Sequence, residues 1–195
     1  MSNAYIFIGR SGSGKGTQGA LLDALIRGRD GADSLIYLET GRLFREFIKA
    51  DGESNRMAKA INEVGGLQPE FLTVHLWSNF FVKNFRRGVN IITDGTPRKL
   101  LETGVLDTAF SFYGFKKPYV VFLNTSVGEC KKRLLARGRA DDTPEDINSR
   151  LAWYETDVAP SVDFYRNNPN YNFCDVNGDQ SVEDVFEDIK KQLGL

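Results

Sequence analysis

The chain is poor in the residue types that build structural zinc sites. Its 195 residues include two cysteines, Cys130 and Cys174, and one histidine, His75. A structural zinc ion takes four Cys or His ligands, so these three side chains exclude a four-ligand site. Two cysteines in a chain without a recognisable leader are typical of a reducing compartment, and we expect both thiols to be free.

Other absences narrow the class of protein further. No apolar run approaches the roughly 20 residues that a bilayer-spanning helix needs. The N-terminus has no basic segment followed by a long apolar stretch, as a secretion signal would. The formal net charge is -1, which argues against general binding to nucleic acid or to membrane surfaces. We therefore expect a cytoplasmic protein without nucleic-acid or membrane partners.

The residues that are present predict one α/β domain. Hydrophobic residues make up 41% and charged residues 26%, which is typical of a globular protein. Short β-branched and aromatic runs alternate with longer segments of helical period. This alternation predicts a parallel sheet with helices on both faces, whose ligands bind at the carboxyl ends of the strands. The predicted strands are YIFIG (5–9), LIYL (35–38), VNIIT (89–93), YVVFL (119–123) and YNFCDV (171–176).

One stretch interrupts the alternation. Residues 41–87 contain about three helical segments and no strand, which predicts an inserted helical unit. A later helix is predicted to begin at Thr143-Pro144, a capping residue followed by proline. The last helix is predicted from one apolar face. That face consists of Val182, Val185, Phe186, Ile189 and Leu193.

The sequence GRSGSGKGTQ, residues 9–18, has the form of a phosphate-binding loop between a strand and a helix. Its glycines let backbone N–H groups point at phosphate, and the helix N-terminus adds partial positive charge. Lys15 would reach the β- and γ-phosphates. The common pattern has Ser or Thr directly after the lysine, but here Gly16 follows and the hydroxyl comes at Thr17. The alternative is a plain glycine turn.

The pattern GxxGxGKGTQ resembles the nucleoside monophosphate kinase family, and adenylate kinases in particular, in which Gly-Thr replaces the single Ser or Thr. The resemblance implies a three-layer P-loop fold with a helical insertion that binds the monophosphate and a lid. It also implies that the loop binds ATP. The residues implied in the loop are Gly12, Ser13, Gly14, Lys15, Gly16 and Thr17.

TGRLFR, residues 40–45, resembles the segment that begins the family's monophosphate-binding helices. Arg45 matches the arginine that grips the acceptor phosphate. Thr40 matches the threonine near the acceptor base, and Gly41 belongs to the same segment. Arg42 stands where the family usually has aspartate. By itself the motif is weak, since an arginine on a solvated helix face is the simpler interpretation.

TDGTPRKLLE, residues 93–102, resembles the family's DGFPRxxxQ segment. Asp94 follows a buried strand, where a carboxylate can hold Mg²⁺ through its water shell. Gly95 and Arg98 match acceptor-site residues, and the guanidinium of Arg98 suits bridging phosphates. Thr96 stands where the family usually has an aromatic residue. A strand-to-helix turn chosen for its geometry is the alternative interpretation.

RLLARGRADDTPEDINSRLAWY, residues 133–154, resembles the family's lid region. Arg133 and Arg137 lie four residues apart and share one helix face. The connection at about 138–141 is very short, so the resemblance is to a short-lid adenylate kinase without the zinc-bearing long lid. The alternative is a basic helix end beside a capped acidic helix start. The matching lid residues are Arg133, Arg137, Arg139, Arg150 and the acidic pair Asp141-Asp142.

The resemblance covers nearly the whole chain and implies one kinase domain. It divides the chain into a core (1–39, 88–137 and 142–195), a monophosphate-binding insertion (about 40–87) and the short lid. The implied reaction is reversible phosphoryl transfer from MgATP to AMP, giving two ADP, by a monomer that uses Mg²⁺ and no zinc. Implied catalytic residues are Lys15, Arg98, Arg133, Arg139 and Arg150; Arg133 and Arg137 also bind ATP. Implied acceptor-binding residues are Thr40, Gly41, Arg45, Gly95, Arg98, Glu102, Arg139 and Arg150.

The acceptor base is the open question. Glu102 stands where the family has glutamine, whose amide both donates and accepts, whereas an ionised carboxylate only accepts. Guanine offers two donors on the edge concerned, so GMP is an alternative acceptor to AMP, as is a pyrimidine monophosphate. A further alternative is that Glu102 points to solvent and backbone groups read the base.

Two other classes of function stay open. A P-loop kinase acting on a sugar or a shikimate-like acceptor would keep the loop without needing Arg45 and the lid arginines. A nucleotide-binding protein without catalysis would be expected to lose Lys15 or Asp94, and both are present.

Overall fold

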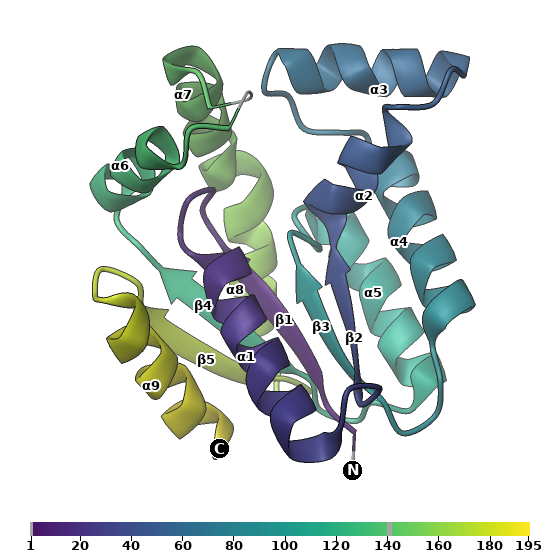
Figure 1. Cartoon of the computed structure of the whole chain (residues 1–195), viewed down its shortest axis with the longest axis vertical. Coiled ribbons are helices and arrows are strands. Elements are labelled where there is room, and N and C mark those ends of the chain that lie inside the picture. The colour runs from purple at the N-terminus through teal and green to yellow at the C-terminus, as the bar shows by residue number, and fades with distance from the viewer. Residues whose placement is uncertain (1, 140–141) are drawn as a thin grey trace.

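A parallel β-sheet forms the centre of the fold (Figure 1). In this computed structural model, which describes residues 2–139 and 142–195, the sheet has five strands in the order β2-β3-β1-β4-β5. Each neighbouring pair is parallel, so the carboxyl ends of all the strands meet at one edge. The strands are β1 (Ala4–Gly9), β2 (Leu35–Glu39), β3 (Asn90–Asp94), β4 (Tyr119–Asn124) and β5 (Asn172–Asn177).

Helices cover both faces of the sheet, as Figure 1 shows. One face packs against α1 (Lys15–Asp30) and α9 (Val182–Leu193). The other packs against α4 (Glu70–Asn84), α5 (Leu100–Tyr113) and α8 (Ala159–Arg166). The remaining helices are α2 (Thr40–Phe47), α3 (Glu53–Glu63), α6 (Val127–Arg137), α7 (Pro144–Trp153) and the π-helical η1 (Tyr154–Val158).

Strand β1 shows how the sequence builds two cores from one sheet. Successive side chains of a strand point to opposite faces, so Tyr5 and Phe7 join the core under α1 and α9. Ala4, Ile6 and Ile8 join the core under α4, α5 and α8. All six residues of the strand are buried, which explains why it is a continuous apolar run without polar alternation.

The predicted strands and helices are confirmed with one local exception. Each predicted strand agrees with the observed one to within one residue at either end. The three helices predicted in 41–87 are α2, α3 and α4, and the hydroxyl of Thr143 caps α7 by accepting a hydrogen bond from the Asp146 N–H. The prediction that Val182 belongs to the buried face of α9 is wrong. It is 45% exposed because the helix begins there, next to an exposed turn.

Two further features bear on the sequence predictions. Cys130 and Cys174 are both free thiols and both buried. No helix in the described part of the chain is long and apolar enough to cross a membrane. The division into core, insertion and lid stays a prediction, and residues 140 and 141 of the expected lid lie outside the described residues.

Phe81 and Phe112 allow the core to be tested by matched substitutions. Phe81 is 1% exposed and its ring contacts those of Trp77 and Phe110, whereas Phe112 is 85% exposed. We expect Phe81→Ala to lower the free energy of unfolding by about 3–5 kcal/mol, because it leaves a cavity. Phe112→Ala should change it by about 0.5 kcal/mol or less. Urea denaturation followed by circular dichroism measures both, and equal losses would contradict the assigned core.

Candidate active site

The phosphate loop joins β1 to α1 at the carboxyl edge of the sheet. The Ser13 N–H donates to the Arg10 carbonyl at 3.1 Å, which closes the turn. Gly12 has φ 83°, and a Cβ there would lie 2.6 Å from the Cys130 carbonyl oxygen. Only glycine lets the loop approach α6 so closely. The loop is therefore positioned by a helix more than a hundred residues further along the chain.

Lys15 crosses the loop that precedes it. Its Nζ donates to the carbonyl oxygens of Gly9, at 2.9 Å, and Arg10, at 2.7 Å. Burial lowers the pKa of Lys15 to about 8, Asp94 opposes this effect, and the nearby guanidinium of Arg98 adds to it. A cation held at the strand edge by neutral backbone carbonyls remains suited to an anionic ligand.

Gly16, where the common loop pattern has Ser or Thr, lies against Asp94. Asp94 ends β3, and a Cβ at position 16 would lie 3.3 Å from its Oδ2. A side chain directly after the lysine would crowd this carboxylate, and the hydroxyl follows at Thr17. Burial raises the pKa of Asp94, Lys15 counteracts this, and the neighbouring Glu39 carboxylate raises it further. Asp94 thus lies among charges of both signs at the floor of the site.

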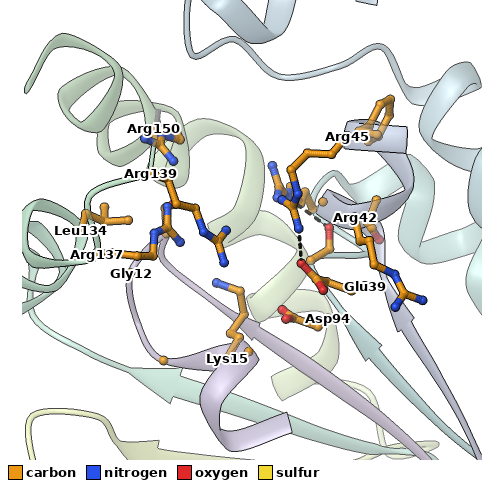
Figure 2. Close-up of a pocket in the computed structure, with 18 of the residues that line it drawn as sticks. Gly12, Lys15, Glu39, Arg42, Arg45, Asp94, Leu134, Arg137, Arg139 and Arg150 are labelled. Carbon is orange, nitrogen blue, oxygen red and sulfur yellow. Dashed lines mark hydrogen bonds and ion pairs between the residues drawn. The ribbon is translucent and has the colours of Figure 1, made fainter. Parts of the chain in front are cut away.

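Glu39 was missed by sequence reasoning. It ends β2, and its Cα pairs in register with that of Asp94 on β3. Its Oε1 lies 2.6 Å from Nη2 of Arg45 on α2, as Figure 2 shows. The available signal was its place at a strand end directly before the TGRLFR motif. Glu39 holds the guanidinium of Arg45 toward the strand edge.

These groups share one cleft of about 1170 Å³ above the strand ends. In Figure 2, Arg45 and Glu39 lie on one side of Lys15 and Asp94, and Arg137, Arg139 and Arg150 lie on the other. Of the predicted residues, these line the cleft: Gly12, Gly14, Lys15, Gly16, Thr17, Thr40, Gly41, Arg45, Asp94, Gly95, Arg98, Glu102, Arg133, Arg137, Arg139 and Arg150.

Ser13 is the predicted site residue that does not line the cleft. It is 2% exposed, and its Oγ is buried without a hydrogen-bond partner among the described residues. Its carbonyl accepts hydrogen bonds from Thr125 Oγ1, at 3.2 Å, and from Arg133 Nη1, at 3.4 Å. Its side chain faces the interior because the turn directs the residue under the loop.

Asp142 gathers the arginines that precede and follow the lid. Its Oδ1 accepts hydrogen bonds from Nη2 of Arg137, at 2.7 Å, and of Arg150, at 2.9 Å. Its Oδ2 accepts from Arg137 Nε and from the Arg139 N–H. Burial opposes the charge, but these hydrogen bonds hold the pKa of Asp142 well below its usual range. The other acid of the predicted pair, Asp141, lies outside the described residues.

Arg133 is held by the protein itself. Its Nε donates to Glu129 Oε1 at 3.0 Å, and Nη2 donates to the Gly178 carbonyl at 2.9 Å. Together with the contact to the Ser13 carbonyl, these bonds tie α6 to the phosphate loop and to the loop after β5. These hydrogen bonds therefore fix the orientation of the Arg133 guanidinium in the wall of the cleft.

At the other end of the cleft, Arg98 and Glu102 are close neighbours. The Arg98 guanidinium lies 5.5 Å from the ring centroid of Trp153, and the indole Nε1 of Trp153 donates to the Gly65 carbonyl. Glu102 is 1% exposed, so the alternative in which it points to solvent is wrong. Arg45 lines the cleft and pairs with Glu39, but its side chain is 46% exposed, so its role in binding stays a prediction.

This fold and its loop define a P-loop protein. A family model described as "Adenylate kinase" matches residues 7–170. The chain is 32% identical to adenylate kinase 1 of Nostoc sp. over 97% of both chains. It is 30% identical to an adenylate kinase of Prochlorococcus marinus, over 99% of this chain and all of the relative, and 31% identical to one of Bacteroides fragilis. The chain belongs to the adenylate kinase family.

The arginine cluster at Asp142 can be tested by stability. We expect Asp142→Asn to lower the free energy of unfolding by about 2 kcal/mol near neutral pH, because charged hydrogen bonds to a nearly buried side chain are lost. The folded-state pKa is depressed, so this stabilisation is present above the unfolded pKa and is lost as pH falls. The difference from the wild type should therefore shrink in acid, as measured by urea denaturation.

Asp163 provides the matched control. It pairs with Arg166 at 3.0 Å, but its side chain is 66% exposed. Asp163→Asn should cost about 0.5 kcal/mol or less. Equal costs for the two substitutions would contradict a special role of Asp142.

Proposed function

We propose that the chain catalyses reversible phosphoryl transfer from MgATP to AMP, giving two ADP. The observation that carries this proposal is a single cleft with cationic side chains on both walls and Lys15 between them. Its volume exceeds the roughly 300–1,000 Å³ typical of a pocket for one small ligand. The chain belongs to the adenylate kinase family, and its named relatives are all adenylate kinases, which supports the same reaction.

We assign the donor nucleotide to the phosphate loop. Backbone N–H groups of the loop and the N-terminus of α1 would receive the phosphates of ATP. Ser13 would contribute through its backbone, because its side chain is buried beneath the loop. The ATP-binding set is Gly12, Ser13, Gly14, Lys15, Gly16, Thr17, Arg133 and Arg137.

We assign the acceptor to the opposite wall, where Arg45 and Arg98 suit a phosphate and Thr40 and Glu102 suit a base. Arg45 would exchange its ion pair with Glu39 for the acceptor phosphate, which can accept from both guanidinium nitrogens. The acceptor-binding set is Thr40, Gly41, Arg45, Gly95, Arg98, Glu102, Arg139 and Arg150.

Phosphoryl transfer between two phosphates needs in-line positioning and positive charge more than a general base. The catalytic roles therefore go to Lys15, Arg98, Arg133, Arg139 and Arg150, which surround the centre of the cleft. Their hydrogen bonds to carbonyls, to Glu129 and to Asp142 hold several of them before substrate arrives. Such preorganisation is the main source of electrostatic stabilisation of a transition state.

The site fits a magnesium ion held mainly by substrate. Mg²⁺ in kinases is usually bound by one or two carboxylates, waters and phosphates. Asp94 places one carboxylate at the floor of the cleft beside Lys15, and Glu39 ends the neighbouring strand. The bound ion would neutralise phosphate charge, and Asp94 would hold it through water. The proposal requires no zinc, and it takes the enzyme to be a cytoplasmic monomer without nucleic-acid partners.

The reaction is tested by a coupled assay of ATP with AMP, GMP, CMP and UMP. We expect turnover with AMP, and no turnover with any monophosphate would refute the kinase function. Lys15→Ala should lower kcat/KM by about 10²–10³ fold, because it removes one preorganised charge from the transition state. The matched control is Lys49→Ala in the turn after α2, where the side chain is 68% exposed and its loss should leave activity unchanged.

The role of Asp94 is tested by titrating magnesium. We expect activity to vanish with EDTA and to return with Mg²⁺. Asp94→Asn should raise the Mg²⁺ concentration needed for half-maximal activity by about tenfold or more, because it removes the carboxylate that holds the water shell. Asp23→Asn, at the cleft rim in an ion pair with Arg27, is the control. An unchanged magnesium requirement in Asp94→Asn would exclude this role.

A further inference from the structure

Glu102 brings a carboxyl group to the acceptor end of the cleft and leaves half of it without a partner. Its Oε2 accepts hydrogen bonds from the Arg98 N–H, at 2.9 Å, and from Thr96 Oγ1, at 3.3 Å. Its Oε1 is buried and has no hydrogen-bond partner among the described residues. The residue lines the cleft and is 1% exposed. A buried polar atom that lies in a cleft wall without a protein partner is available to a bound water or to a ligand.

The charges around Glu102 come from three directions. The Arg98 guanidinium lies on the loop before α5, and Glu70 of α4 lies nearby in an ion pair with Lys99 at 3.0 Å. Tyr165 of α8 also lies near, with its hydroxyl buried beside Thr103. Burial raises the pKa of Glu102, the Arg98 N–H and guanidinium counteract it, and Glu70 raises it further.

We propose that Glu102 reads the acceptor base as a neutral carboxylic acid, whose Oε1 hydroxyl donates a hydrogen bond to ring N1 of adenine. This inference rests on the proposed function and assigns the chemistry of its base-binding end. A neutral carboxylic acid has one donor and one acceptor oxygen, like the amide of the glutamine that the family carries at this position.

The hydrogen bonds favour one oxygen for the proton. Oε2 accepts from the Arg98 N–H and from Thr96 Oγ1, and a carbonyl oxygen is a better acceptor than a hydroxyl oxygen. We therefore assign the proton to Oε1, the atom without a partner among the described residues, and N1 of adenine is an acceptor that matches it. An ionised Glu102 would instead set a carboxylate against the lone pair of N1, which is repulsive.

Gln68 supplies an acceptor for the 6-amino group of adenine. It is 8% exposed and lines the same cleft, and its Oε1 is buried without a partner among the described residues. Its Nε2 donates to the Ala58 carbonyl at 2.8 Å, which fixes the orientation of the amide. A hydroxyl donor at Glu102 and a carbonyl acceptor at Gln68 together complement the N1 and amino positions of adenine.

Guanine requires an acceptor at Glu102, where adenine requires a donor. Its N1–H and 2-amino group are both donors, so it suits an ionised carboxylate that accepts twice. The protonation state of Glu102 therefore sets the acceptor preference: AMP when neutral and GMP when ionised. Binding of the AMP phosphate at Arg98 would cancel the positive charge that favours the carboxylate, so AMP binding should draw a proton onto Glu102.

The test compares the affinities of AMP and GMP by calorimetry from about pH 5 to about pH 10, for the wild type and for Glu102→Gln. The amide cannot titrate, and both proteins share the titration of the ligand phosphate. Relative to the variant, wild-type affinity for AMP should fall about tenfold per pH unit once Glu102 ionises in the free protein but stays protonated in the complex, and affinity for GMP should not fall. Wild-type AMP binding should also take up a proton that the variant does not.

A ligand analogue tests the same contact without altering the protein. In 1-deaza-AMP a C–H replaces ring N1, so the proposed hydrogen bond cannot form. Wild-type protein should bind it about tenfold or more weakly than AMP at low pH, and the extra pH dependence should disappear. AMP and 1-deaza-AMP binding alike, or parallel pH profiles of the two proteins, would overturn the inference. ADP formation from AMP in the same preparation would show that the kinase function stands regardless.

Discussion

The structure depends on holding many arginines together at one edge of a sheet in the absence of phosphate. Guanidinium groups do not lose their charge, so their mutual repulsion must be offset by the protein. Carboxylates do this at both walls: Asp142 binds Arg137 and Arg150, and Glu39 binds Arg45. Backbone carbonyls serve the same purpose for Lys15. Internal carboxylates and carbonyls thus hold the cationic side chains of the cleft in place, where an anionic ligand can bind them.

This constraint accounts for the spacing of the motifs along the chain. Parallel strands bring residues 9–16, 39–45 and 94–102 to one edge, since each segment directly follows a strand. The close approach of Gly16 to Asp94 shows how strictly these segments fit together. Glycine after the lysine leaves room for a carboxylate of the neighbouring strand, a contact that the loop sequence alone does not show.

Much of the fold could be predicted from the sequence, because buried strands and capped helices leave strong local patterns. The apolar run of β1 and the Thr143-Pro144 start of α7 are of this kind. Contacts between distant segments left no such pattern. The pairing of Glu39 with Arg45, the carbonyls that hold Arg133, and the burial of Ser13 under its loop depend on tertiary packing. Glu102 could be recognised as unusual, but its orientation came only from the hydrogen bonds of Arg98 and Thr96.

Trp153 gives the molecule a built-in optical reporter. Of the two tryptophans, Trp77 is 1% exposed in the core, while Trp153 lines the cleft. The indole of Trp153 contacts the Arg98 guanidinium and donates to the Gly65 carbonyl in the turn after α3. It therefore touches two walls of the cleft at once. With Trp77 replaced by phenylalanine, the fluorescence of Trp153 would report rearrangement of those two walls in a stopped-flow experiment, without any attached dye.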